Sequence, residues 1–389
     1  MMQAARKLPI GIQDFETIRN ENYIYVDKTQ YIWDLVQSGK SYFLSRPRRF
    51  GKSLFVSALK SYFEGRKDLF KGLAIEALEN RKGEKAWIQY PILYFSLSGG
   101  NYLNEPGLED VLSSIIHTYE KEYQLTGNYA ITGKTLPVQF RELIENLYAK
   151  TGKKIVVLVD EYDKPLLETM AVNRELEEKN RQIYKSFFSV LKDEDALIKF
   201  TFFTGVTRFG KVSIFSDLNQ LNDISLDDAA AGICGINESQ LFSEFKPEVE
   251  TLMKIQNLSY HECLKKLSQT YDGYHFSPHG EGMYNPFSLF QAFSKNSFGK
   301  YWFETGTPSF LIHELKASGV TAVQLTDGIE TNASSLQNYQ DESLNLIALL
   351  YQTGYLTIYD YDQEFDIYTL RFPNDEVKDS IFRAFREIG

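Results

Sequence analysis

Short apolar runs alternate with amphipathic stretches along most of the chain. Four runs have the length and composition of buried strands, at residues 40–45, 92–97, 155–159 and 199–204. A long helical pattern, residues 174–191, separates the last two runs. Strands that are joined by helical crossovers pair in parallel, so the pattern predicts an α/β fold with a parallel sheet flanked by helices.

The segment "SRPRRFGKSL" follows the first predicted strand. A helix is predicted directly after Gly51, because apolar residues then recur at helical spacing. The face that they form consists of Leu54, Ala58, Leu59 and Phe63. Gly51 is therefore expected at a turn from strand to helix.

Composition and charge narrow the class of protein. A chain of 389 residues with 43% hydrophobic and 24% charged residues is typical of a globular protein of two or three domains. Its net charge of -10 argues against a whole-surface nucleic-acid binder. Cys234 and Cys263 are too few for a disulfide framework, so buried thiols are expected. No apolar run approaches the roughly 20 residues of a membrane span, and a cytoplasmic protein is expected.

The tripeptide Gly51-Lys52-Ser53 is the first candidate for chemistry. On its own it is equally typical of an ordinary helix start. At a strand-to-helix turn, however, free backbone N–H groups and the helix dipole attract phosphate. Lys52 can then reach the terminal phosphates, and Ser53 can hold magnesium.

A second motif supports a nucleotide site. The apolar strand in "KIVVLVDEYDKP" runs into Asp160 and Glu161, which are suited to hold hydrated magnesium and to polarise attacking water, respectively. A third motif is the strand that ends in "FFTGVTRFG", with Thr204, Thr207 and Arg208 at the edge where α/β ligands bind. We expect a polar residue there to sense the γ-phosphate, and the sequence does not separate Thr204 from Thr207.

The opening "GIQDFETIRNENYIYVDKTQYIWDLVQSGKSYFLSRPRRFGKSL" resembles that of the AAA-ATPase-like family of bacterial P-loop NTPases. Further stretches match the family in order, and the resemblance covers most of the chain: "YVDKT", "RPRRFGKS", "VDEYDKP", "GVTRF", "YDGYHF", "YNPFS", "TGTPSFL", "TGYLTI" and "FPNDEV". Members often carry a C-terminal PD-(D/E)XK nuclease domain.

The resemblance implies that ATP and Mg²⁺ bind at the loop and at the strand end after it. The implied nucleotide-binding residues are Arg46, Pro47, Arg48, Arg49, Phe50, Gly51, Lys52, Ser53, Leu54 and Asp160. Arg46 stands where the general P-loop has glycine, and Pro47 favours extended geometry at that position. The "YVDKT" segment would bring Asp27 or Lys28 near the base or phosphates, unless it forms a plain surface turn.

The last third of the chain predicts a helical region and then a smaller module. Helical patterning continues to about His313, and Pro278 and Gly280 interrupt the spacing of His275 and His279, which favours structural histidines over a metal pair. Core packing is expected for Tyr271, Tyr274, Phe276 and Tyr284.

Near the C-terminus, the order helix, glycine stop at Gly354, strand, polar turn and strand, then helix, resembles a winged helix. Its acidic turn around Asp362 would repel nucleic-acid phosphate, so a protein partner is favoured. The predicted domains are 1–235, nucleotide-binding, 236–335, helical lid, and 336–389, winged-helix-like. Too few residues follow Phe372 for a nuclease core, and neither Glu-x-Lys tripeptide completes a nuclease site. We expect a shortened form or a natural version without that effector.

Two functional hypotheses follow. The first is a magnesium-dependent ATPase whose cycle moves the C-terminal modules and regulates a nuclease or other protein effector. The second is a regulatory module that uses bound nucleotide as a switch with negligible turnover, or an accessory module that binds nucleic acid. In either case we expect one of Arg48 and Arg49 to face the nucleotide and the other to pair with a carboxylate, with Asp163 as a candidate.

Overall fold

The computed structural model describes residues 6–125, 134–170, 172–208, 220–303, 318–337 and 346–387, together with Leu311 and Leu315. The chain divides into two compact units. The sheet unit comprises Thr29–Ser45 and Val56–Ile224, and the loop unit comprises Met1–Lys28, Arg46–Phe55 and Ser225–Gly389. The expected three-part division at residues 235 and 335 remains a prediction. Residues 1–28 and the candidate phosphate loop cluster with the C-terminal half of the chain.

The described residues of the sheet unit form five strands. They are β1 (Ser41–Ser45), β2 (Ile92–Ser96), β3 (Ile155–Asp160), β4 (Ile198–Gly205) and β5 (Asn222–Asp223). All pair in parallel in the order β2-β3-β4-β1-β5. The predicted parallel α/β sheet is therefore confirmed, and the four strands expected from the sequence lie within a residue or two of their predicted positions.

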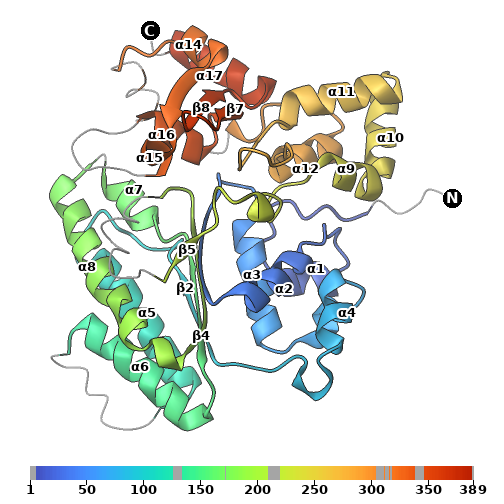
Figure 1. The fold of residues 1–389 in the computed structure, drawn as a ribbon. Coiled ribbons are helices and arrows are strands. Elements are labelled where there is room, and N and C mark those ends of the chain that lie inside the picture. Colours follow the sequence, from blue (N-terminus) through green and yellow to red (C-terminus); the bar gives the residue numbers. More distant parts are fainter. Residues whose placement is uncertain are drawn as a thin grey trace. The chain divides into compact units, whose positions relative to one another are not determined.

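Helices cover both faces of this sheet. Figure 1 shows α5, α6 and α8 on one face and α2, α3 and α4 on the other. Their bounds, with that of the short α7, are α2 (Thr29–Ser38), α3 (Lys52–Phe63), α4 (Ala74–Asn80), α5 (Gly107–Glu122), α6 (Leu136–Thr151), α7 (Lys164–Met170) and α8 (Arg174–Asp193). Local chemistry fixes some of these ends: Asn173 caps α8 through the N–H of Leu176, and Gly152 ends α6 in the left-handed conformation.

Strand register aligns the carboxyl ends of the sheet. Ser45 of β1 lies opposite Gly205 of β4, and Asp160 of β3 lies opposite Ser96 of β2. β4 separates β1, which leads into the loop, from β3, which ends in the acidic motif. The two strands that carry the candidate motifs are therefore not neighbours in the sheet.

The loop unit carries a helical cluster and a three-stranded antiparallel sheet of order β6-β8-β7. Its elements are α1 (Phe15–Asn20), α9 (Glu238–Glu244), α10 (Lys246–Ile255), α11 (Tyr260–Tyr271), α12 (Pro286–Lys295), α14 (Ala322–Asp327), β6 (Ile329–Asn332), α15 (Ala333–Gln337), α16 (Leu346–Thr353), β7 (Thr357–Asp362), β8 (Ile367–Arg371) and α17 (Asp375–Glu387). The predicted order of helix, strand, strand and helix is present in α16, β7, β8 and α17. β6 was not expected, and the winged-helix assignment stays a prediction.

Side chains that were expected in the core are buried. Tyr271, Tyr274, Phe276 and Tyr284 are each at most 5% exposed, and both cysteines are buried thiols. Much of the "TGTPSFL" match lies outside the described residues. Within the described ranges, no helix has the length and hydropathy needed to cross a membrane.

Candidate functional site

The backbone of the loop alternates in handedness. Arg49 has φ +67° and Gly51 has φ +96°, whereas Phe50 between them and Lys52 at the start of α3 have negative φ. Successive residues of opposite hand turn their N–H groups toward one concavity, which is a binding site for anions. The alternating sign of φ over residues 49–52 is therefore compatible with a phosphate cradle.

Glycine and arginine occupy the two left-handed positions for different reasons. A Cβ at Gly51 would meet nothing within 4 Å, so the conformation, rather than lack of space, favours glycine there. Arg49 adopts the left-handed conformation despite its side chain, which costs about 1–2 kcal/mol. Strain of this kind is concentrated at functional sites.

Lys52 directs its ammonium group back at the loop. Its Nζ atom donates to the carbonyl oxygens of Arg46 (2.9 Å) and Pro47 (3.0 Å), and the residue is only 7% exposed. A charged donor held by two carbonyls can exchange them for a stronger acceptor such as phosphate. Ser53, the next residue, is partly exposed at the start of α3.

Arg46 does not project from the loop as a phosphate ligand in this structure. Its guanidinium is buried, donates to the carbonyls of Ser225 (2.7 Å) and Ala230 (3.0 Å), and lies 4.4 Å from the ring centroid of Phe276. The side chain therefore fastens the start of the loop to the segment 225–230. Sequence reasoning could not find this contact, because its partners lie 179 and 184 residues away.

The two remaining arginines differ in their surroundings. Both are exposed, and the Arg49 guanidinium lies 5.1 Å from the ring centroid of Phe287. The carbonyl of Arg48 accepts the indole N–H of Trp302 at 3.0 Å. The expected pairing of one arginine with a carboxylate stays a prediction.

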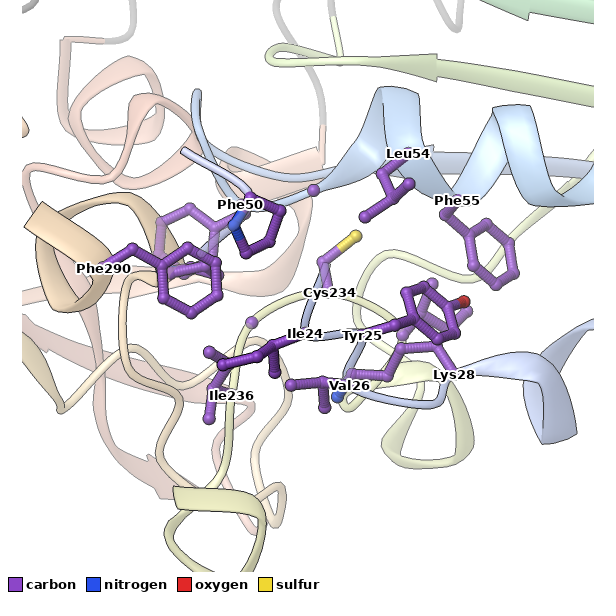
Figure 2. Close-up of a pocket in the computed structure, with 15 residues that line it drawn as sticks. Ile24, Tyr25, Val26, Lys28, Phe50, Leu54, Phe55, Cys234, Ile236 and Phe290 are labelled. Atoms are coloured by element: carbon purple, nitrogen blue, oxygen red, sulfur yellow. The ribbon is translucent and has the colours of Figure 1, made fainter. Parts of the chain in front are cut away.

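An apolar pocket adjoins the loop (Figure 2). Phe50, Gly51, Leu54 and Phe55 line it from the loop and the start of α3, opposite Ile24, Tyr25, Val26, Lys28, Cys234, Ile236 and Phe290. In Figure 2, Phe50 and Phe290 lie at one end of this pocket and Phe55 and Tyr25 at the other. The cavity volume is ≈ 80 Å³, which holds several water-sized groups, since one needs about 10–15 Å³.

Lys28 is the charged residue of this pocket. Its Nζ donates to the carbonyl of Gly232 (2.8 Å) and to Oε1 of Gln240 (2.9 Å). Burial lowers the pKa of Lys28 to about 8, against the smaller opposing effects of Cys234, Asp27 and Glu281. The "YVDKT" segment therefore lines a pocket and is not a plain surface turn.

The acidic motif ends β3 in the sheet unit. Asp160 is 3% exposed and accepts the N–H of Glu161 (3.0 Å) and the hydroxyl of Tyr94 (3.5 Å). Burial and the Asp160 carboxylate raise the pKa of Tyr94, so its hydroxyl stays protonated as a donor. Glu161 is partly exposed and has φ +54°, a strained conformation for a residue with a side chain.

The three candidate phosphate sensors all have partners within the sheet unit. Thr204 Oγ1 donates to the carbonyl of Leu44 (2.9 Å). Thr207 Oγ1 donates to Asp163 (2.7 Å), which also accepts the N–H groups of Val206 and Thr207. Arg208 forms a buried ion pair with Asp223 of β5. These contacts stabilise the turn after β4, and a role for any of the three at a phosphate stays a prediction.

Comparison with known proteins places these features in a family. Residues 9–215 match the model of a family described as predicted AAA-ATPase. The chain is also similar to a protein of Azotobacter chroococcum mcd 1 described as "Uncharacterized protein in vnfD 5'region". The two are 38% identical over 383 residues, which are 97% of this chain and 70% of that protein.

Proposed function

The chain belongs to the predicted AAA-ATPase family, and from that premise we propose that it binds ATP with Mg²⁺ and hydrolyses it. The observation that supports the proposal is the alternating sign of φ from Arg49 to Gly51, which favours an anion cradle at the start of α3. The N–H groups of this cradle and the ammonium of Lys52 bind the phosphates.

The acidic motif supplies the chemistry. We assign Ser53 and Asp160 to Mg²⁺, and Glu161 to the orientation of the attacking water. Magnesium, when bound, neutralises charge on the phosphates. Covalent connection supports the assignment, since Arg46 directly follows β1 and Asp160 ends β3, and both strands finish at the carboxyl edge of the same parallel sheet.

The apolar pocket is assigned to the nucleotide base. Phe50, Gly51 and Leu54 belong to both the loop and the pocket, so a ligand held by the loop has this cavity beside it. Aromatic and aliphatic walls of this kind bind flat heterocycles by burial of apolar surface. In this assignment the Lys28 ammonium keeps its hydrogen bonds to Gly232 and Gln240 and does not contact phosphate.

A second function is favoured by one observation. Pro47 and Arg48 of the loop contact Gly354 and Trp302, which belong to the C-terminal part of the same unit. Nucleotide binding at the loop can thus bias the C-terminal helices and the β6-β8-β7 sheet without turnover, as a switch that acts on a protein effector or a nuclease. The acidic β7–β8 turn makes nucleic acid the less favoured partner.

Phosphate release at saturating ATP and Mg²⁺, measured with and without DNA, separates the two functions. Sustained multiple turnovers are expected from the ATPase. Tight binding of ATP with at most one turnover would exclude the ATPase and support the switch. Absence of binding, checked by calorimetry with ATP, would overturn both.

A further inference from the structure

Trp302 contacts the phosphate loop from a position 254 residues away in the sequence. Its indole Nε1 donates to the carbonyl oxygen of Arg48 at 3.0 Å, and the side chain is 5% exposed. The contact lies within the loop unit. Nothing in the nucleotide-binding motifs calls for a tryptophan at this point.

Because the peptide group between Arg48 and Arg49 is planar, this hydrogen bond also affects the N–H of Arg49. In a trans peptide the carbonyl of one residue and the N–H of the next point in opposite directions. Because the indole holds the Arg48 carbonyl, the N–H of Arg49 is directed away from Trp302. Arg49 is the first left-handed residue of the anion cradle, so Trp302 sets the direction of the first cradle N–H.

Trp302 is itself held by the last helix. Oε1 of Glu376, in α17, accepts the backbone N–H of Trp302 at 2.7 Å. Both carboxylate oxygens of Glu376 also accept the hydroxyl of Ser288, at 2.8 and 3.1 Å, and the residue is 1% exposed. The ring of Tyr355 packs against the indole with a centroid distance of 5.3 Å. The position of the indole is therefore defined by C-terminal residues.

A second contact reaches the loop beside the first. Gly354 lies so close to Pro47 that an added Cβ would fall 2.7 Å from the Cβ of Pro47 and 3.4 Å from the indole of Trp302. Pro47 and Arg48 are consecutive, so C-terminal residues contact the same stretch of loop twice. One contact is steric and the other is a directed hydrogen bond.

We propose that Trp302 is a positioning residue for phosphate binding, which directs the N–H of Arg49 at the ligand and makes phosphate affinity depend on Glu376 and α17. The proposal rests on the proposed function, because it requires that the loop binds phosphate. It goes beyond that function by naming the group outside the motifs that shapes the loop.

Calorimetric titration with ATP and with pyrophosphate tests the proposal on the Trp302→Phe variant of the full chain. Phenylalanine keeps an aromatic ring and removes the N–H donor. We expect affinity for both ligands to fall about three- to tenfold, the range of one hydrogen bond. The matched control is Trp87→Phe, which removes an indole N–H that donates to Asn80 at 3.0 Å in the sheet unit, and it should bind as the wild type does. Equal affinities of wild type and Trp302→Phe would overturn the proposal.

Tryptophan fluorescence gives a readout that a purely structural role would not move. The chain has three tryptophans, so Trp302 is the sole tryptophan in a Trp33→Phe/Trp87→Phe protein. Pyrophosphate should shift its emission, because the indole is bonded to the loop. A protein that binds pyrophosphate with unchanged emission contradicts the proposal, whereas a wild-type chain that binds neither ligand refutes the proposed function itself.

The second pair of variants addresses Glu376. Glu376→Gln keeps an oxygen that accepts the Trp302 N–H, and it should bind pyrophosphate within about twofold of wild type. Glu376→Ala removes the acceptor and should weaken binding in the same direction as Trp302→Phe. If Glu376→Ala folds and binds as tightly as Glu376→Gln, the dependence on α17 is wrong.

Discussion

The Nζ atom of Lys52 lies 2.9 Å from the carbonyl oxygen of Arg46, the residue that stands where a general P-loop has glycine. The lysine closes the loop on itself, and the guanidinium of Arg46 is turned away into the loop unit. The backbone carbonyl of Arg46 thus accepts a hydrogen bond from Lys52, while its side chain stabilises the fold. Glycine at this position could provide only the first of these contacts.

Lys52→Met should weaken ATP binding at least tenfold, because the loop loses its charged donor to the phosphates. The control is Lys85→Met, which removes an exposed lysine and should bind ATP as wild type does. Calorimetry gives both affinities. Undiminished affinity in Lys52→Met would exclude the lysine from the phosphate site.

Glu161→Gln should lower the rate of ATP hydrolysis about 100-fold or more and leave ATP affinity within about twofold, since the amide cannot act as a base toward water. Glu168→Gln is the matched control: Glu168 pairs with Lys164 on α7 and should retain full turnover. Phosphate release under multiple turnover measures the rates. A variant as fast as wild type would remove Glu161 from the mechanism.

Arg48→Ala should mainly lower ATP affinity, and Arg49→Ala should mainly lower folding stability. Both side chains are exposed, and we expect Arg48 to contribute to ATP affinity, with about a tenfold loss on truncation. Arg49 lies over Phe287, so its truncation should cost about 0.5–1 kcal/mol of folding stability and change affinity less than Arg48→Ala does. Calorimetry and denaturant unfolding measure the two effects. The reverse ranking of affinities would show that Arg49 leaves Phe287 for the nucleotide.

Because of Lys28, the free energy of unfolding should rise with pH. Its pKa is about 8 in the folded chain and 10.5 without burial, so between these values the unfolded chain binds a proton that the folded chain does not. Unfolding free energy of wild type relative to Lys28→Met should therefore increase by about 3 kcal/mol from pH 8 to pH 10.5.

Denaturant titrations at several pH values measure this difference, with Lys85→Met as the control that should show none. Comparison with a variant cancels the titration of groups that both proteins share. A constant difference across the window would show that Lys28 keeps its ordinary pKa.

The sheet was predictable because its signals are local. Residues 155–159 are apolar without interruption and flanked by polar turns, so β3 and its terminal Asp160 could be located from sequence. β5 was missed because it spans only Asn222–Asp223, too short for any periodic pattern. The four predicted strands paired as expected because helices separate them in the chain.

The surroundings of the loop were not predictable. Glycine, lysine and serine identify the loop, but the partners of Arg46 and Arg48 lie far along the chain, and no local pattern links them. The contact of Trp302 with the loop could not be predicted, since a tryptophan in an aromatic-rich segment is typical of core packing. The apolar pocket was not predicted, although the "YVDKT" segment that lines it was expected near the nucleotide.

The strand order also affects synthesis on the ribosome. β1 is the strand from which the loop starts, and it pairs with β4, whose last residue, Gly205, follows Ser45 by 160 residues. At a translation rate of about 5–20 residues per second, the ribosome completes β4 roughly 10–30 s after β1. The acceptors of Arg46 and the indole that holds Arg48 are made later still. A nascent chain therefore exposes residues 46–48 before the partners that hold them have been synthesised.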